Sequence, residues 1–325
     1  MLLQPIPAQM NEVVALAPAK INLHLEVLGL RPDGFHELAM VMQSLELADR
    51  LLFRPRWDGR IQLTSNNASV PLDGSNLIVK AAMRLRHQLG RAELGVDIQL
   101  DKRIPIGAGL AGGSSDAAAS LAGLNRLWQA GLGHSCLEAL AAELGSDVPF
   151  CLSGGTQLCF GRGERLEAIP QLGAQGLAAL LLKHPEASVS TPRAYGRYRE
   201  LRGDFYLNRE QDFDERRQFL RAGPLVEALL GRNDWPRLRN DLQSVVMPEQ
   251  PTVRQGLDLL SELDDSVAVA MSGSGPSVFA LFTSLDLATK ARQIGLDRFC
   301  SAGFESWVCG FVPCGVSLES PPATA

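Results

Sequence analysis

The sequence lacks the features that mark membrane-spanning, exported and metal-binding proteins. Its longest uninterrupted apolar stretch, residues 176–182, is far shorter than the roughly 20 residues that cross a bilayer. The six cysteines form no CxxC pair, and no HExxH motif, EF-hand or Cys/His cluster occurs. We therefore expect reduced thiols and no protein-made metal site. No signal or transit pattern precedes Lys20, so we expect a cytoplasmic protein with no membrane partner.

Lysine is also scarce, since 26 of the 31 basic residues are arginines. The 36 acidic residues outnumber the basic ones and give a net charge of -5, which argues against nucleic acid as a partner. The length of 325 residues predicts about two domains. With so few lysines, a lysine in a special sequence context is a candidate for chemistry.

Alternating and amphipathic patterns predict a mixed α+β chain. In the first half, the expected strands are residues 21–27, 40–47, 51–54 and 96–100, and the expected helices are residues 76–89, 116–128 and 135–144. In the second half, the expected strands are residues 177–183, 267–271, 278–282 and 307–312, with several helices that include residues 285–294. Two successive sets of strands and helices are typical of two α+β units.

Residues 170–176 are rich in glycine and glutamine and begin with a proline, and we take this segment as the domain boundary. We expect an N-terminal domain of residues 1–168 and a C-terminal domain of residues 169–325, with a disordered tail from about residue 317. The charged stretch 202–221 is most simply a solvated helix or loop face, and we assign it no chemistry.

A glycine-rich segment, residues 105–115, leads into the alanine-rich helix expected at 116–128. It contains a GxGxxG match, but Pro105 interrupts the approach and no acidic residue follows at the spacing that a dinucleotide site needs. No Gly-Lys pair occurs, which excludes a Walker loop. Exposed backbone N–H groups at the start of a helix favour a phosphate ligand over the alternative, a flexible loop with a serine N-cap.

Three other features are ambiguous when each is taken alone. Asp147, in the segment 145–149, fits an ordinary N-cap of a short helix, and the segment 271–277 fits a hairpin turn. Lys20 shares one face of its strand with Asn22 and His24 and would otherwise be one more surface cation.

Taken together, these motifs resemble the GHMP kinase superfamily. The segment 105–115 resembles its phosphate-binding loop, and Ser272 to Ser277 resembles its third, glycine-rich motif. Three further segments, Pro-Ala-Lys-Ile-Asn-Leu at 18–23, Arg-Pro-Asp-Gly-Phe-His at 31–36 and Gly-Ser-Asp-Val-Pro-Phe at 145–150, narrow the resemblance to one branch of that family. The motifs keep the family order from about residue 18 to 312. The resemblance does not cover the first 17 residues, the charged stretch or the tail.

The resemblance implies a two-domain α+β GHMP-kinase-like fold with the active site in the interdomain cleft, and a ferredoxin-like second domain. It implies transfer of the γ-phosphoryl group of ATP to the 2-hydroxyl of a cytidine-diphosphate-linked methylerythritol in the non-mevalonate isoprenoid pathway. Asp147 would be the general base and Lys20 its catalytic partner. Magnesium would accompany ATP, held mainly by the phosphates. The partners are therefore small molecules, and the oligomeric state is not indicated.

The resemblance also assigns binding residues by motif match. The ATP-binding residues are Pro105, Ile106, Gly107, Ala108, Gly109, Leu110, Ala111, Gly112, Gly113, Ser114 and Ser115. The residues for the second substrate are Asn22, Phe35, His36, Tyr195, Ser272, Gly273, Ser274 and Gly275. Phe35 would stack on the cytosine base and His36 would hydrogen-bond it.

Several points remain open at the level of sequence. Tyr198 is the alternative to Tyr195 as a second stacking residue. The Asn240-Asp241-Leu242 segment resembles a family signature but fits helix capping as well. Ala111 replaces a glycine of many family loops and is tolerated if its φ is negative. Two other functions are a kinase for homoserine or mevalonate, which the residues Phe35 and His36 disfavour, and a non-catalytic nucleotide sensor, which would not need both Lys20 and Asp147.

Overall fold

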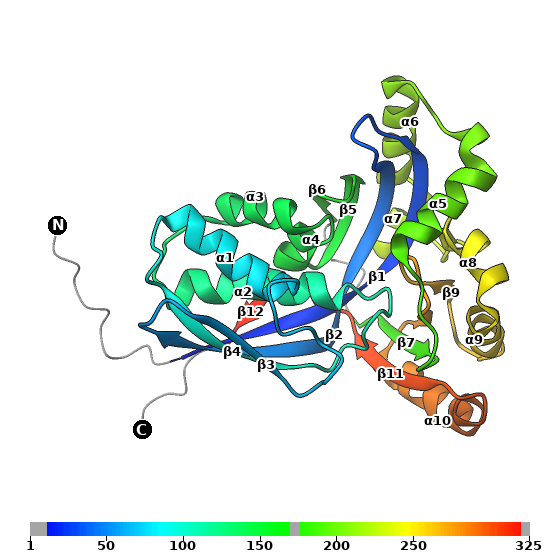
Figure 1. Ribbon diagram of the computed structural model, residues 1–325. Helices are drawn as coiled ribbons and strands as arrows, with labels where there is room; N and C mark the ends of the chain where they lie inside the picture. Colours follow the sequence, from blue (N-terminus) through cyan, green and yellow to red (C-terminus); the bar gives the residue numbers. More distant parts are fainter. Residues whose placement is uncertain (1–11, 170–175, 320–325) are drawn as a thin grey trace.

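Two β-sheets organise the residues that the computed structural model describes, 12–169 and 176–319 (Figure 1). The first sheet has eight strands, with the order β12-β1-β2-β4-β3 and with β5, β6 and β8 paired off this path. Its strands are β1 (Val13–Leu30), β2 (His36–Arg56), β3 (Ile61–Ser65), β4 (Gly95–Asp101), β5 (Thr156–Gly161), β6 (Arg165–Ala168), β8 (Arg239–Asn240) and β12 (Ser317–Leu318). The second sheet comprises β7 (Ala178–Lys183), β9 (Ala268–Met271), β10 (Val278–Phe282) and β11 (Glu305–Gly310).

The predicted strand 21–27 lies inside β1, and the two strands predicted at 40–47 and 51–54 merge into β2. β1 and β2 pair antiparallel over most of their length, with register shifts at Pro18/Lys20 and Asn22/His24. Such bulges bend a strand and re-aim its side chains.

The second register shift changes which side of β1 faces which core. Ile21 and Leu23 lie in a hydrophobic cluster with β7 and β10, whereas Leu25 and Val27 lie in the other cluster, with α1 and α2. The expectation that Lys20, Asn22 and His24 share one face is therefore wrong for His24, because the bulge between Asn22 and His24 breaks the alternation.

Four helices cover one face of the first sheet (Figure 1). They are α1 (Leu77–Leu89), α2 (Gly112–Leu127), α3 (His134–Leu144) and α4 (Val148–Ser153). Asn76 caps α1 by accepting a hydrogen bond from the N–H of Ile78 at 2.9 Å. α2 begins at Gly112, four residues before the predicted start at residue 116, so the last part of the glycine-rich segment is helical.

The second half of the chain supplies the remaining helices. They are α5 (Thr191–Arg202), the 3₁₀ turn η1 (Gly203–Phe205), α6 (Glu210–Arg221), α7 (Pro224–Leu229), α8 (Gln243–Glu249), α9 (Pro251–Ser261) and α10 (Leu285–Ser301). The second sheet has the antiparallel order β11-β7-β10-β9, with α8 and α9 before β9 and with α10 between β10 and β11. This is the order of a ferredoxin-like βαββαβ unit. None of the helices in the described ranges is long and apolar enough to cross a membrane.

Two expectations about irregular segments are corrected in part. A disordered tail was expected from about residue 317, but Ser317 and Leu318 are not part of one, since they pair with Leu16 and Ala15 of β1 and so satisfy backbone groups at the sheet edge. Residues 320–325 lie outside the described residues. The charged stretch 202–221 was expected to be a solvated helix or loop face; residues 210–221 form α6, but Arg217 and Leu220 of this helix are buried, so the face is not wholly solvated.

The domain boundary expected at 168/169 remains a prediction, because residues 170–175 next to it also lie outside the described residues.

Candidate active site

A pocket of about 850 Å³ is lined by residues from both halves of the chain. It contains the catalytic candidates Lys20 and Asp147. All residues expected to bind ATP or the second substrate also line it, except Ser115 and Ser272. The motifs that the sequence separates by up to 250 residues therefore meet in one pocket.

Lys20 and Asp147 face each other in this pocket. The Lys20 Nζ lies 3.4 Å from Asp147 Oδ2, donates a hydrogen bond to Asn22 Oδ1 at 2.7 Å and approaches the carbonyl of Gly109 at 3.4 Å. The lysine side chain is 5% exposed, whereas that of Asp147 is 32% exposed and open to a substrate. A carboxylate with this access can take a proton, and the ammonium can stabilise an oxygen on which charge develops.

Asp147 precedes α4, as the N-cap alternative required, but its side chain makes no capping hydrogen bond. Its carboxylate is thus directed at Lys20 instead of at the helix it precedes. This geometry favours a chemical role over the capping role that the sequence left open.

The phosphate-loop candidate and the third motif are held together by backbone contacts. Gly109 adopts a φ of 73°, and a Cβ there would lie 2.5 Å from the carbonyl oxygen of Ser272 and 2.8 Å from that of Gly275. The Ser272 hydroxyl donates to the carbonyl of Gly109 at 3.1 Å. Ser272 is therefore a buried support of the loop rather than part of the pocket wall.

Ser115 is also a support rather than a lining residue. It is fully buried, and its hydroxyl donates to the carbonyl of Pro18 at 2.7 Å, which joins α2 to β1. Ser114, Gly113 and Gly112 line the pocket at the start of α2, where helix geometry leaves N–H groups without intrahelical acceptors. That end of α2 is suited to bind an anion.

Ala111 immediately before α2 has a φ of 55°, in the left-handed region. Alanine at position 111 was expected to be tolerated if its φ were negative, and this condition is not met. A non-glycine residue costs on the order of 1 kcal/mol there, and the surrounding loop has to offset it.

Lys102 is a pocket residue that the sequence reasoning missed. Its Nζ donates to Asp49 at 2.5 Å and to Asp116 at 2.7 Å, and it lies beside the first turn of α2. Burial lowers the pKa of the Lys102 ammonium, but the two carboxylates outweigh this effect and raise it. The only available signal was the scarcity of lysine, because the partner Asp49 lies far away in the sequence.

Another part of the pocket lining is aromatic and includes Phe35, His36 and Tyr195. Phe35 is half exposed beneath the guanidinium of Arg162, 4.9 Å from the ring centre. His36 stacks on Tyr195 with ring centres 5.0 Å apart. Burial, with a smaller contribution from the charge of Arg199, lowers the pKa of His36. A neutral imidazole can both donate and accept hydrogen bonds, as recognition of a base edge requires.

Tyr198 lies outside the pocket lining, and its hydroxyl donates to Asp241 at 3.1 Å. Of the two tyrosines left open by the sequence, Tyr195 is the one that lines the pocket. His24 is likewise absent from the lining.

The Asn240-Asp241-Leu242 segment does more than cap a helix. The Asn240 amide donates to the carbonyls of Met271 and Gly273, at 2.7 and 2.8 Å, while its oxygen accepts from the N–H of Leu242. Asp241 accepts from the N–H of Val27 in β1 at 2.8 Å. The segment therefore holds the third motif against the strand that carries Lys20.

Comparison with known proteins agrees with this arrangement. The family model for the GHMP kinases N terminal domain matches residues 76–155, and that for the GHMP kinases C terminal domain matches residues 220–299. A 4-diphosphocytidyl-2-C-methyl-D-erythritol kinase of Prochlorococcus marinus (strain MIT 9313) is 56% identical over 316 residues, 97% of this chain and 98% of its own length. The enzyme of the same name from Synechococcus sp. (strain CC9605) is 56% identical over 95% of this chain and 100% of its own.

Solved structures give the same result. A crystal structure of 4-(cytidine 5'-diphospho)-2C-methyl-D-erythritol kinase matches with a TM-score of 0.70 and 33% identity, over 92% of this chain and 98% of the other. A homoserine kinase from Cytophaga hutchinsonii matches with a TM-score of 0.70 at 22% identity, over 98% of this chain and 100% of the other, which shows the shared fold alone. The identity and coverage of these relatives confirm the resemblance found in the motifs, and the chain belongs to the 4-diphosphocytidyl-2-C-methyl-D-erythritol kinase family of GHMP kinases.

Proposed function

We propose that this protein transfers the γ-phosphoryl group of ATP to the 2-hydroxyl of 4-diphosphocytidyl-2-C-methyl-D-erythritol, a step in the non-mevalonate isoprenoid pathway. One observation carries the proposal: Lys20 and Asp147, whose charged atoms lie 3.4 Å apart, line the same pocket as the glycine-rich loop and the aromatic residues Phe35, His36 and Tyr195. A phosphoryl donor and a nucleotide-linked acceptor can then meet at the pair.

In the proposed mechanism, the start of α2 and the loop around Gly109 bind the phosphates of ATP. Asp147 accepts the proton of the 2-hydroxyl as that oxygen attacks the γ-phosphorus, and ADP leaves in line with the new bond. Lys20 holds the carboxylate in place and stabilises the developing charge on the attacking oxygen. Asn22 accepts a hydrogen bond from Lys20 and so fixes the direction of the ammonium.

In the aromatic part of the pocket, we propose that Phe35 and Tyr195 stack on the cytosine base. His36 would read its edge, because the buried His36 Nε2 has no hydrogen-bond partner among the described residues. Such an atom is costly to leave unpaired and is satisfied by a polar ligand.

Magnesium would enter with ATP and neutralise phosphate charge. No group of three or more acidic, histidine or cysteine side chains in the described ranges could hold a metal on its own. The residues nevertheless fit a phosphate-held ion, because Asp116 and Ser114 line the pocket and the buried Asp116 Oδ1 has no hydrogen-bond partner among the described residues. Oxygen ligands of this kind are those that magnesium prefers.

We also place the reaction in the cytoplasm, with small molecules as the only proposed partners. The support for this compartment is that all six cysteines are free, as a reducing compartment keeps them.

The test is an incubation of the purified protein with ATP, magnesium and one of three acceptors: 4-diphosphocytidyl-2-C-methyl-D-erythritol, homoserine or mevalonate. We expect a product heavier by one phosphoryl group with the first acceptor alone. Phosphorylation of homoserine or mevalonate would instead favour the alternative function, a kinase for that acceptor. ATP binding without turnover of any acceptor would favour a nucleotide sensor.

Replacing Tyr195 with alanine removes the ring that stacks on His36. We expect the KM for the cytidyl substrate to rise by about tenfold, because an aromatic stack on a base contributes on the order of 1–3 kcal/mol. The KM for ATP should stay within about twofold in the same steady-state assay.

Tyr198→Ala is the matched control, since it removes a ring of the same kind that lies outside the pocket, together with its hydroxyl contact to Asp241. If the Tyr198 variant instead showed the large rise in KM and the Tyr195 variant did not, the choice of Tyr195 would be wrong.

A further inference from the structure

Helix α6 is tied to the first sheet by three arginines, each of which meets a glutamate on a different strand. Arg216 pairs with Glu26 of β1 at 2.8 Å, Arg217 with Glu37 of β2 at 2.5 Å, and Arg221 with Glu167 of β6 at 2.6 Å. The middle pair differs from the others because both of its side chains are buried, at 3% and 4% exposure. The charged stretch 202–221, which the motifs do not explain, therefore contributes one buried ion pair to β2, at the residue next to His36.

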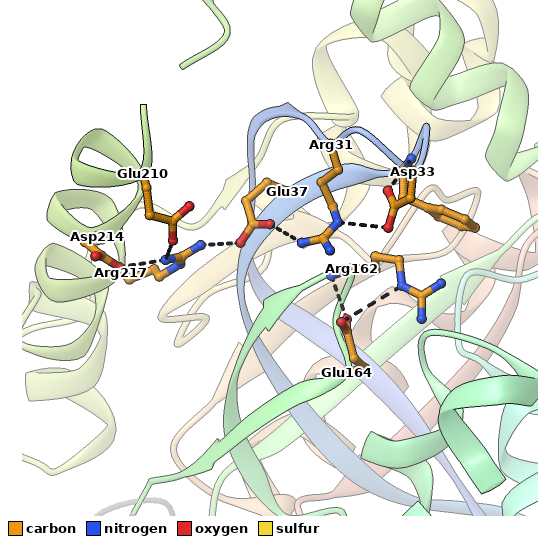
Figure 2. Close-up of polar contacts among 9 residues, drawn as sticks. Arg31, Asp33, Glu37, Arg162, Glu164, Glu210, Asp214 and Arg217 are labelled. Atoms are coloured by element: carbon orange, nitrogen blue, oxygen red, sulfur yellow. Dashed lines mark hydrogen bonds and ion pairs between the residues drawn. The ribbon is translucent and has the colours of Figure 1, made fainter. Parts of the chain in front are cut away.

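The Glu37 carboxylate links this pair to the turn at residues 31–36. One of its oxygens accepts from Arg217, and the other accepts from Arg31 at 2.6 Å (Figure 2). Arg31 in turn donates to Asp33 at 3.2 Å. A continuous chain of charged groups thus runs from α6 into the turn.

That chain ends on the residue expected to stack on the base. Asp33 accepts a hydrogen bond from the N–H of Phe35 at 3.1 Å, and the carbonyl of Phe35 accepts from the N–H of Arg31 at 2.7 Å. Glu37 directly follows His36 in β2. Both recognition residues are therefore connected to Arg217 through Glu37: Phe35 by way of Arg31 and Asp33, and His36 as its neighbour in β2.

A second contact from the same segment reaches His36 itself. The ring of Tyr206 meets the His36 ring edge-on, 5.6 Å between centres, and the N–H of Leu207 donates to the carbonyl of Leu28 at 2.8 Å. The stretch 202–221 thus contacts His36 through the ring of Tyr206, and it contacts Glu37, the next residue in β2, through Arg217.

Charge-assisted hydrogen bonds fix the position of the Arg217–Glu37 pair. Arg217 also donates to Glu210 and Asp214 at its outer end, at 2.7 and 2.6 Å (Figure 2). Charge-assisted hydrogen bonds in a buried setting are strong and directional. If the guanidinium of Arg217 were removed, Arg31 would be the only charged partner left to Glu37 among the described residues. The position of Arg31 would then shift toward Glu37, and its hydrogen bond to Asp33 would weaken.

We propose that Arg217 and Glu37 are positioning residues for the cytidyl end of the substrate, through which α6 holds the 31–36 turn so that His36 stacks on Tyr195 and Phe35 lines the pocket. This inference rests on the proposed function. Neither residue lines the pocket, so neither touches the substrate. Their effect is on the recognition of the acceptor and not on ATP or on the chemical step.

The test compares Arg217→Met with Arg221→Gln by steady-state kinetics, varying each substrate while the other is saturating. Arg221 is the matched control because it ties the same helix to β6 without contacting the turn. For the Arg217 variant, we expect the KM for the cytidyl substrate to rise by about tenfold, the change that the loss of one charge-assisted hydrogen bond produces. Its kcat and its KM for ATP should stay within about twofold, and the Arg221 variant should resemble the wild type.

Arg31→Gln is the second variant, in case the Arg217 variant does not fold. It breaks the same chain at a partly exposed position, and we expect the same selective rise in KM with a smaller size. A partial recovery in Arg217→Lys, which restores the charge without the fork of the guanidinium, would support a positioning role.

An unchanged KM for the cytidyl substrate in both the Arg217 and Arg31 variants would overturn the inference. Equal rises in the KM for ATP and for the cytidyl substrate would also overturn it, because they would indicate a general loss of structure. A wild type that does not phosphorylate the cytidyl substrate would refute the proposed function, a result that is read before any variant is compared.

Discussion

Replacing Asp147 with asparagine is expected to lower kcat by about 100-fold or more while ATP binds almost as in the wild type. The amide keeps the size of the side chain but cannot accept the proton of the attacking hydroxyl. Because the carboxylate makes no capping hydrogen bond to α4, its loss should not unfold the helix. The expected change is therefore in the chemical step.

Single-turnover kinetics and an ATP titration by calorimetry separate these effects for the Asp147 variant. A selective loss of rate with unchanged ATP affinity supports the general base. If ATP affinity fell in proportion to the rate, Asp147 would instead be a structural residue of the pocket.

Replacing Gly109 with alanine should produce the second large effect, a loss of about 100-fold in kcat/KM for ATP, as expected when reacting groups are displaced by about 1 Å. The added Cβ would lie 2.5 Å from the carbonyl oxygen of Ser272, so the loop or the third motif must move. The positive φ of 73° adds backbone strain.

Gly133→Ala is the matched control for the loop variant. Gly133 has a φ of -71° and no atom within 4 Å of its added Cβ, so it should retain wild-type kinetics. Steady-state kinetics with varied ATP measure both variants. If Gly109→Ala kept wild-type kcat/KM, the close packing of the two glycine-rich segments would not matter for catalysis.

The sequence predicts the local elements of this fold well. Asn76 and Gly90 delimit α1 because a cap and a left-handed glycine act over a few residues. The alternation in β1 also predicts that Lys20 and Asn22 lie together, and the structure brings Asn22 within hydrogen-bond distance of Lys20. Such signals are readable because neighbouring residues determine them.

Features that depend on distant partners were missed. The bulge that turns His24 away from the pocket arises from pairing with β2, and the strand at Ser317 forms only because the edge of β1 is open to it. The Arg217–Glu37 pair joins residues 180 positions apart. A charged stretch is therefore predicted to be solvated unless the distant carboxylate that pairs with its arginine is known.

The pocket itself was predicted through motif resemblance, not through spacing. Composition alone did not connect Lys20 with Asp147, and each motif alone had an ordinary structural explanation. Lys102 shows the limit of this reasoning, because it lines the pocket but its partner Asp49 carries no recognisable motif.

The central claim is that the Lys20–Asp147 pair directs the phosphoryl group to the 2-hydroxyl of the cytidyl substrate. Proton-coupled phosphorus NMR of the product made from ATP and 4-diphosphocytidyl-2-C-methyl-D-erythritol tests it most directly. The carbon that bears this hydroxyl also bears the methyl group and has no hydrogen, so the account predicts a new phosphomonoester signal without proton splitting, which Asp147→Asn forms about 100-fold more slowly. A split phosphomonoester signal, which reports a primary or secondary hydroxyl, or ADP release without a new signal, would contradict the account.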